Sequence, residues 1–177
     1  MINFFKNIIR FVLFLGVQVY VLNNVPPLHH FISPVIYYLF LLWLPFSTDK
    51  FWLLIIGFLL GLSFDYFLMT PGLHAAGCVL IMYLRPALIN LFVQYEKNEF
   101  TYREPSAAAM GWAPFLTYVF ILTIVYHGYI SFLEWLQFGN FLDFLFKIIS
   151  SSIISMLLVI TLEVIFSRKQ KLRSTMS

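Results

Sequence analysis

Five ionisable side chains lie within or at the ends of long apolar runs, where a charge is costly. They are Asp65, His74, Arg85, His127 and Glu163. Charged groups at membrane depth are usually paired with one another or with backbone groups, and they often mark functional positions. Each of the five is therefore a candidate for ion pairing, proton exchange or the recognition of a partner.

Asp65 belongs to a face of small residues. Gly57, Gly61 and Asp65 are spaced four apart, so they share one side of a predicted helix. Glycines at this spacing let a second helix backbone approach closely, which predicts a helix-packing or partner-binding face. Two interpretations of the carboxylate stay open. It either fixes a neighbouring helix or a partner, or it reaches outer-side water or caps the helix that follows Gly72.

The connection that follows Asp65 is rich in turn formers and small residues. Residues 69–77 read Met-Thr-Pro-Gly-Leu-His-Ala-Ala-Gly, which predicts a tight hairpin. Gly72 and Ala76 are expected to continue the packing face into the next helix. His74 is expected to form an interfacial hydrogen bond, because no second metal ligand stands at a useful spacing.

Arg85 and Glu163 are predicted to lie at similar depths in the inner half of the membrane. Two arrangements are compatible with the sequence. The side chains form an intramembrane ion pair, or each extends separately to the cytoplasmic interface.

Signatures of catalysis and of cofactor binding are missing, which predicts a protein that is not an enzyme and needs no cofactor or metal. Cys78 is the single cysteine, and the adjacent His29 and His30 cannot easily chelate one metal. Ser63 follows Gly61 in a Gly-x-Ser pattern similar to that of rhomboid proteases, with His127 as a formal base. The bulky Phe64 after this serine argues against that assignment.

The composition predicts a membrane protein. The 177-residue chain is 61% hydrophobic and only 11% charged, whereas a soluble domain carries about 25% charged residues. Its mean hydropathy is +0.87. The net charge of +3 does not indicate nucleic-acid binding, because the cations are spread among apolar runs.

Six apolar stretches are long enough, or nearly so, to cross the hydrocarbon core. We therefore predict a single all-α transmembrane domain over 1–177 with a basic cytoplasmic tail. The expected spans are 8–23, 31–46, 51–68, 72–93, 112–133 and 141–166, with the tail at 167–177. The second span is short and follows Pro34, so whether it crosses fully is left open.

Lysine and arginine placement predicts the orientation. With six spans, nine of the eleven cations fall on one side, and Lys147 is the one cation in the outer half. Both ends of the chain are therefore expected in the cytoplasm.

The segment from Gly57 to Pro86 resembles MreD, the family of small rod shape-determining membrane proteins of bacteria, in the form found in Bacteroidetes. The resemblance rests on Gly61-x-x-x-Asp65, a short Pro-Gly turn and Gly72-Leu73-His74-Ala75-Ala76. Length, span number and the short basic tail agree with that family. Gly57, Gly61, Asp65, Gly72 and Ala76 match the family's hairpin.

The resemblance implies a six-helix fold similar to the S component of energy-coupling-factor transporters. It implies a non-enzymatic scaffold of the bacterial inner membrane that binds the transmembrane helix of MreC and acts in cell-wall elongation. The other implied partners are MreB, RodA, a class B penicillin-binding transpeptidase and membrane lipids. The alternative function is the S component of a vitamin-type transporter, which shares the architecture. Its polar candidates are scattered over several helices, namely Gln18, Asp65, Tyr66, His127 and Glu163.

Overall fold

The computed structural model describes residues 2–22, 35–92, 104–136 and 140–165, and these form helices joined by short connections. The predicted tail at 167–177 and the His29-His30 pair lie outside the described residues. The elements in chain order are α1 (Ile2–Gly16), the π-helix η1 (Val17–Val21), α2 (Leu39–Leu42), α3 (Lys50–Leu68), α4 (Leu73–Phe92), α5 (Ala107–Met110), α6 (Trp112–Trp135) and α7 (Phe141–Ile165).

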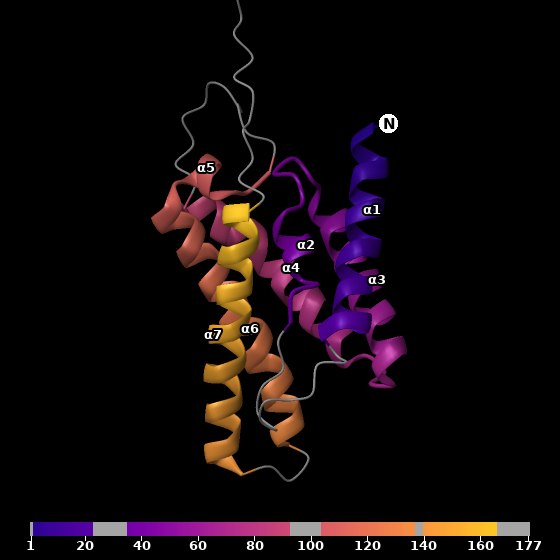
Figure 1. The fold of residues 1–177 in the computed structure, drawn as a ribbon, viewed down its shortest axis with the longest axis vertical. Coiled ribbons are helices and arrows are strands. Elements are labelled where there is room, and N and C mark those ends of the chain that lie inside the picture. Colours follow the sequence, from indigo (N-terminus) through magenta and orange to yellow (C-terminus); the bar gives the residue numbers. More distant parts are fainter. Residues whose placement is uncertain (1, 23–34, 93–103, 137–139, 166–177) are drawn as a thin grey trace, which may run out of the picture.

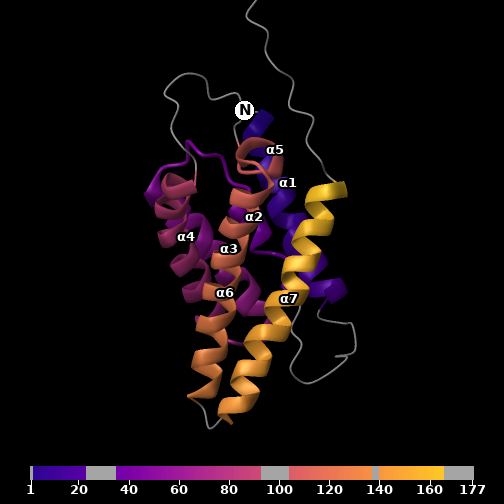
Figure 2. The same cartoon turned by 90° about the vertical axis from the view of Figure 1, so that its left-hand side faces the viewer.

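The long helices run side by side along one axis and form an elongated bundle (Figures 1 and 2). In Figure 1, α1 starts at the upper end of the bundle and α7 finishes there, while α6 and α7 meet at the lower end. The α3–α4 and α6–α7 pairs are therefore antiparallel hairpins, and α4 contacts α6 between them.

Four helices within the described residues are long and apolar enough to cross a membrane, namely α3, α4, α6 and α7. Their observed bounds differ by no more than two residues from the predicted spans at 51–68, 72–93, 112–133 and 141–166. The apolar part of the first helical segment, Asn7–Val21, is shorter. The described residues thus form an all-helical fold with four candidate spans.

The prediction of a second spanning helix over 31–46 is wrong for the part that the structure describes. Only Leu39–Leu42 is α-helical there. Residues 36–41 instead form tight turns, in which the N–H groups of Leu39 and Leu41 each donate to the carbonyl three residues earlier, at 2.9 Å. The turn stops before Pro45, which has no N–H with which to continue a helix.

Helices α3 and α4 make the most extensive contact of any helix pair in the described part of the chain, and glycine permits their close approach. A Cβ atom on Gly61 would lie 2.4 Å from Ala75 Cα and 2.6 Å from His74 O. At Gly57 the corresponding distance to Cys78 O is 3.1 Å. The two backbones therefore touch at Gly61, and nothing larger fits between them.

Gly61→Ala should consequently lower the free energy of unfolding by about 1–3 kcal/mol, because the added methyl group meets rigid backbone rather than a flexible side chain. Gly128→Ala is the matched control, since a Cβ on this α6 glycine meets no atom within 4 Å. Reversible unfolding in bicelles would measure both variants. Equal stabilities of the two variants would contradict the close approach.

Candidate functional site

The interior of the bundle is organised around residues 35–44, which we call the central segment. Its ten side chains are only 0–6% exposed, including Tyr37, Tyr38 and Leu41 at 0%. The N–H groups of residues 39–44 donate to carbonyl groups of the same segment, but those of Val35 and Ile36 do not, and unpaired peptide groups are costly in an apolar interior. Other parts of the protein must therefore supply hydrogen-bond partners.

At the start of the central segment, two side chains accept hydrogen bonds from its backbone. Val35 N–H donates to Ser155 Oγ of α7 at 3.2 Å, and Ile36 N–H donates to Gln18 Oε1 of η1 at 2.8 Å. Gln18 is 1% exposed and lies in the π-helical turn that continues α1. Such turns commonly reorient a side chain at a site with a specific task, and here the task is to satisfy a buried N–H.

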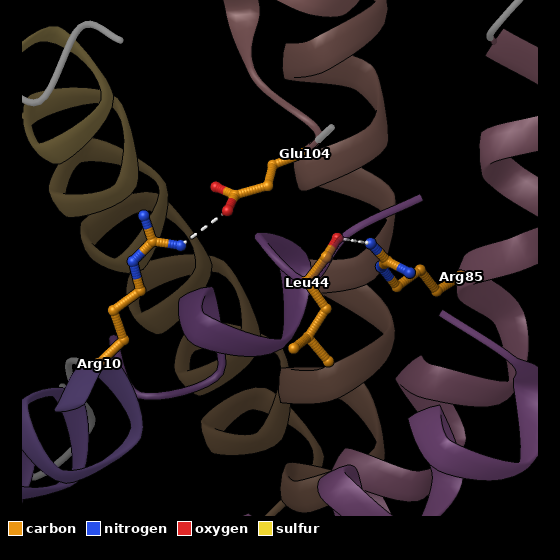
Figure 3. A network of polar contacts seen from close by, with 4 residues as sticks. All are labelled: Arg10, Leu44, Arg85 and Glu104. Carbon is orange, nitrogen blue, oxygen red and sulfur yellow. Dashed lines mark hydrogen bonds and ion pairs between the residues drawn. The ribbon is translucent and has the colours of Figure 1, made fainter. Parts of the chain in front are cut away.

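At the other end of the central segment, two side chains bond to its carbonyl groups. Arg85 of α4 donates to Leu44 O (Figure 3) and, through Nε, to Tyr118 Oη at 3.2 Å. The Tyr118 hydroxyl of α6 in turn donates to Leu42 O at 3.3 Å. Four helical elements, namely η1, α4, α6 and α7, thereby hold one irregular segment.

A cluster of aromatic and polar side chains fills the middle of the bundle. The Tyr126 hydroxyl bonds to Tyr37 Oη and to His74 Nδ1, the latter at 2.7 Å. Tyr38 Oη bonds to Thr123 Oγ1 at 2.9 Å, and the Tyr38 and Tyr126 rings stack with centroids 5.2 Å apart. His74 is hydrogen-bonded, as expected, but its partner is the buried Tyr126 rather than a group at an interface.

Asp65 caps α4, which was one of the two interpretations that the sequence left open. Its carboxylate accepts the N–H groups of His74 and Ala75, both at 2.9 Å, and the Thr70 hydroxyl at 3.0 Å. The side chain is 2% exposed. A carboxylate at a helix N-terminus satisfies free N–H groups and opposes the positive end of the helix dipole.

The other residues of the predicted packing face are Gly57, Gly61, Gly72 and Ala76, and they do not all have the same surroundings. Gly57 and Gly61 pack against α4 of the same chain, so α4 covers the face that the sequence offers to a partner. Ala76 is half-buried in the first turn of α4. The packing role of Gly72 is wrong, because a Cβ there would meet no atom within 4 Å; its φ of +86° serves the turn instead.

The ion pair predicted between Arg85 and Glu163 is also wrong: these two described residues do not bridge to each other. Arg85 is used by the central segment, and Glu163 Oε1 accepts the Ala107 N–H of α5 at 2.9 Å. The sequence could not reveal this, because Arg85 and Glu163 each bond to a backbone group, that of Leu44 and that of Ala107 respectively. Backbone groups of short or irregular elements leave no sequence signal. Both side chains are at most 5% exposed and bond to groups inside the protein.

The described residues form two ion pairs that the sequence did not indicate. Arg10 of α1 pairs with Glu104 at 2.9 Å, which ties the first helix to the segment before α5 (Figure 3). Lys147 of α7 pairs with Glu134 of α6 near the turn between these helices. In the sequence, each of these four charged residues stands on a different predicted span or loop, and nothing in the spacing indicates its partner.

The residues that the sequence suggested for catalytic or metal chemistry have other partners within the described ranges. No group of three or more His, Cys, Asp or Glu side chains could hold a metal ion in those ranges. Ser63 donates to Leu59 O at 2.7 Å and His127 Nε2 bonds to Ser155 Oγ at 2.9 Å. The formal serine–histidine pair that resembles a protease site is therefore not assembled.

Comparisons with known proteins add no assignment. No family model, no curated protein and no solved structure matches the chain.

Asp65→Ala should lower the free energy of unfolding by about 1–3 kcal/mol, because two buried N–H groups and a hydroxyl lose their acceptor. Asp143→Ala is the control, since this carboxylate is exposed in the first turn of α7 and contributes at most about 1 kcal/mol through the helix dipole. Unfolding in bicelles would measure both. A smaller loss for Asp65→Ala than for Asp143→Ala would contradict the capping role.

Arg85→Lys should cost about 1–3 kcal/mol although the charge is kept, because one ammonium group cannot reproduce the guanidinium geometry toward Leu44 O and Tyr118 Oη. Arg10→Lys is the matched control, since its ion pair is partly exposed and such pairs contribute less than about 1 kcal/mol. The same unfolding measurement applies. Equal losses would show that Arg85 acts only as a charge.

Proposed function

We propose that the chain is a non-enzymatic membrane scaffold of the bacterial cell-wall elongation machinery and belongs with MreD. The proposal joins the resemblance of the Gly57–Pro86 hairpin to that family with one structural observation. Most buried polar side chains among the described residues, though not the Ser152 hydroxyl, are already bonded to one another or to the protein backbone. An interior used in this way suits a rigid scaffold better than a site for a hydrophilic solute.

The five polar candidates for a transporter site illustrate the point. Gln18 bonds to Ile36 N–H, Asp65 caps α4, His127 bonds to Ser155, and Glu163 bonds to Ala107 N–H. Tyr66 is 74% exposed on the outer surface of α3. The five groups do not converge on one cavity, which favours the scaffold over the transporter alternative.

We further infer six membrane crossings, with both ends of the chain in the cytoplasm. Besides the four candidate spans, α1 and η1 together contain 20 residues, which corresponds to about 30 Å. The central segment returns in the opposite direction as a crossing that is mostly irregular, which is tolerated at membrane depth where protein surrounds it. This count gives the six-segment architecture of energy-coupling-factor S components.

The inferred orientation places Arg10, Lys50 and Arg85 toward the cytoplasm and Lys147 toward the outside, in agreement with the bias of basic residues to the cytoplasmic side. The bacterial inner membrane is the compartment that this role requires. The proposed partners are the transmembrane helix of MreC, together with MreB, RodA, a class B penicillin-binding transpeptidase and the surrounding lipids.

Affinity purification of the tagged full chain from its native membranes in mild detergent tests the proposal. We expect MreC and wall-elongation enzymes to co-purify, because a scaffold of this kind acts through contacts of its membrane helices. A tagged unrelated multi-pass protein from the same membranes is the control. Recovery of an energy-coupling ATPase pair with its transmembrane transducer would contradict the scaffold and support the transport alternative.

A further inference from the structure

One side of α4 points away from the bundle and carries polar side chains. Five residues spaced alternately four and three apart share this side, and we call them the α4 seam: Ala76, Leu80, Tyr83, Ala87 and Asn90. Ala76 and Leu80 are half-buried, whereas the other three are exposed. Figure 2 shows α4 along the left edge of the bundle. The exposed part of the seam is therefore open to the membrane.

Two side chains of the seam have no hydrogen-bond partner among the described residues. They are the hydroxyl of Tyr83, which is 71% exposed, and the carboxamide of Asn90. Other hydroxyls on the outer surface of the helices are satisfied internally. Those that donate to the carbonyl four residues earlier in their own helix, at 2.6–2.9 Å, belong to Ser63, Thr117, Ser150 and Thr161. A tyrosine hydroxyl lies too far from its own backbone to do the same.

The depth of Tyr83 limits what its partner can be. It is the eleventh of 20 residues in α4, so it lies about 14–15 Å from either helix end at a rise of 1.5 Å per residue. In a hydrocarbon core about 30 Å thick, this position is the middle of the bilayer. Acyl chains offer no hydrogen-bonding group there, and an unpaired polar group in hydrocarbon is costly. A partner at this depth must therefore come from another membrane helix.

A second copy of this chain meets the requirements of both polar groups. In a dimer whose twofold axis runs along the membrane normal, the two α4 helices are parallel, and residues beside the axis face their own copies at equal depth. A phenol hydroxyl and a carboxamide each donate and accept hydrogen bonds. Tyr83 can therefore pair with Tyr83, and Asn90 with Asn90. A different protein would need matching polar groups at both depths.

The spacing of the seam supports the same arrangement. Alternation of four and three is the pattern of parallel two-helix packing, in which a single asparagine commonly sets the register. Ala76 and Ala87 are small, and small side chains let two membrane helices approach closely. The seam carries no charged residue, so two copies meet there without repulsion between like charges.

We propose that the chain forms a dimer in the membrane through the α4 seam, with hydrogen bonds between the two copies of Tyr83 and between the two copies of Asn90. Packing of the seam supplies most of the contact, and the polar pairs fix the register, as is usual for helices that associate in lipid. The dimer goes beyond the proposed scaffold function and does not depend on the partners of that scaffold.

Disulfide crosslinking of the full chain in native membranes tests the dimer. Cys78 is fully buried and donates to Tyr37 Oη, so Cys78→Ser removes the native thiol and keeps a donor. A new cysteine is then placed on the seam by Ala87→Cys, or on α7 by Ile153→Cys as the control, since Ile153 is 55% exposed near the middle of that helix. We expect oxidation with copper phenanthroline to give a dimer of the 20.8 kDa chain from position 87 and little from position 153.

Ala76→Cys provides a second reporter on the same seam, in case position 87 does not tolerate the change. Absence of the dimer from both seam positions would overturn the proposal. Equal dimer yields from positions 87 and 153, or a disulfide from position 87 to a different protein, would overturn it as well.

Variants of the two polar residues test the hydrogen bonds in the Ala87→Cys background. Tyr83→Phe removes only the hydroxyl and should lower the dimer yield about threefold, and Asn90→Leu about tenfold, within the range for hydrogen bonds between membrane helices. Tyr66→Phe is the matched control, since Tyr66 is 74% exposed near the end of α3, and its yield should equal that of the parent. Yields unaffected by both seam variants would overturn the pairing.

The two proposals fail separately. Co-purification of wall-elongation proteins without a disulfide from either seam position would overturn the dimer and leave the scaffold standing. A seam dimer from membranes in which an energy-coupling ATPase pair co-purifies would support the dimer and overturn the wall-elongation role.

Discussion

The hydrogen bonds to the central segment are the constraint on which the rest of the structure depends. The N–H groups of residues 39–44 are bonded within the segment, but a buried segment that is only partly helical leaves other peptide groups for the rest of the protein to satisfy. Here Gln18, Ser155, Arg85 and Tyr118 do so from four different helical elements. Each helix must therefore keep its position and rotation relative to the segment, so that the segment fixes the arrangement of the bundle.

The α3–α4 hairpin is a second rigid part, and it is held by a different mechanism. Gly61 allows backbone contact with Ala75, and the Asp65 carboxylate binds the N-terminus of α4 one turn further along. His74, whose N–H is one of those bound, then bonds to Tyr126 at the centre of the bundle. The hairpin thus positions a group of the central network as well as its own two helices.

The sequence predicts much of this fold because long apolar runs bounded by turn residues locate spanning helices well. The predicted span at 51–68 and the observed helix Lys50–Leu68 illustrate this. Residues 31–46 could not be assigned in the same way, since hydropathy does not distinguish a buried irregular segment from a helix. The spacing of Gly57, Gly61 and Asp65 predicted a helix-packing or partner-binding face, and it could not show that α4 lies against Gly57 and Gly61. The partners of Arg85 and Gln18 escaped prediction because backbone groups of an irregular segment leave no sequence signal.

Amide hydrogen exchange of the full chain in lipid nanodiscs tests the central claim most directly. The account predicts that the N–H groups of residues 35, 36 and 39–44 exchange as slowly as those of the buried part of α6, because they are hydrogen-bonded within the bundle and shielded from water. Exchange as fast as that of residues 46–49, which connect the central segment to α3, would contradict it.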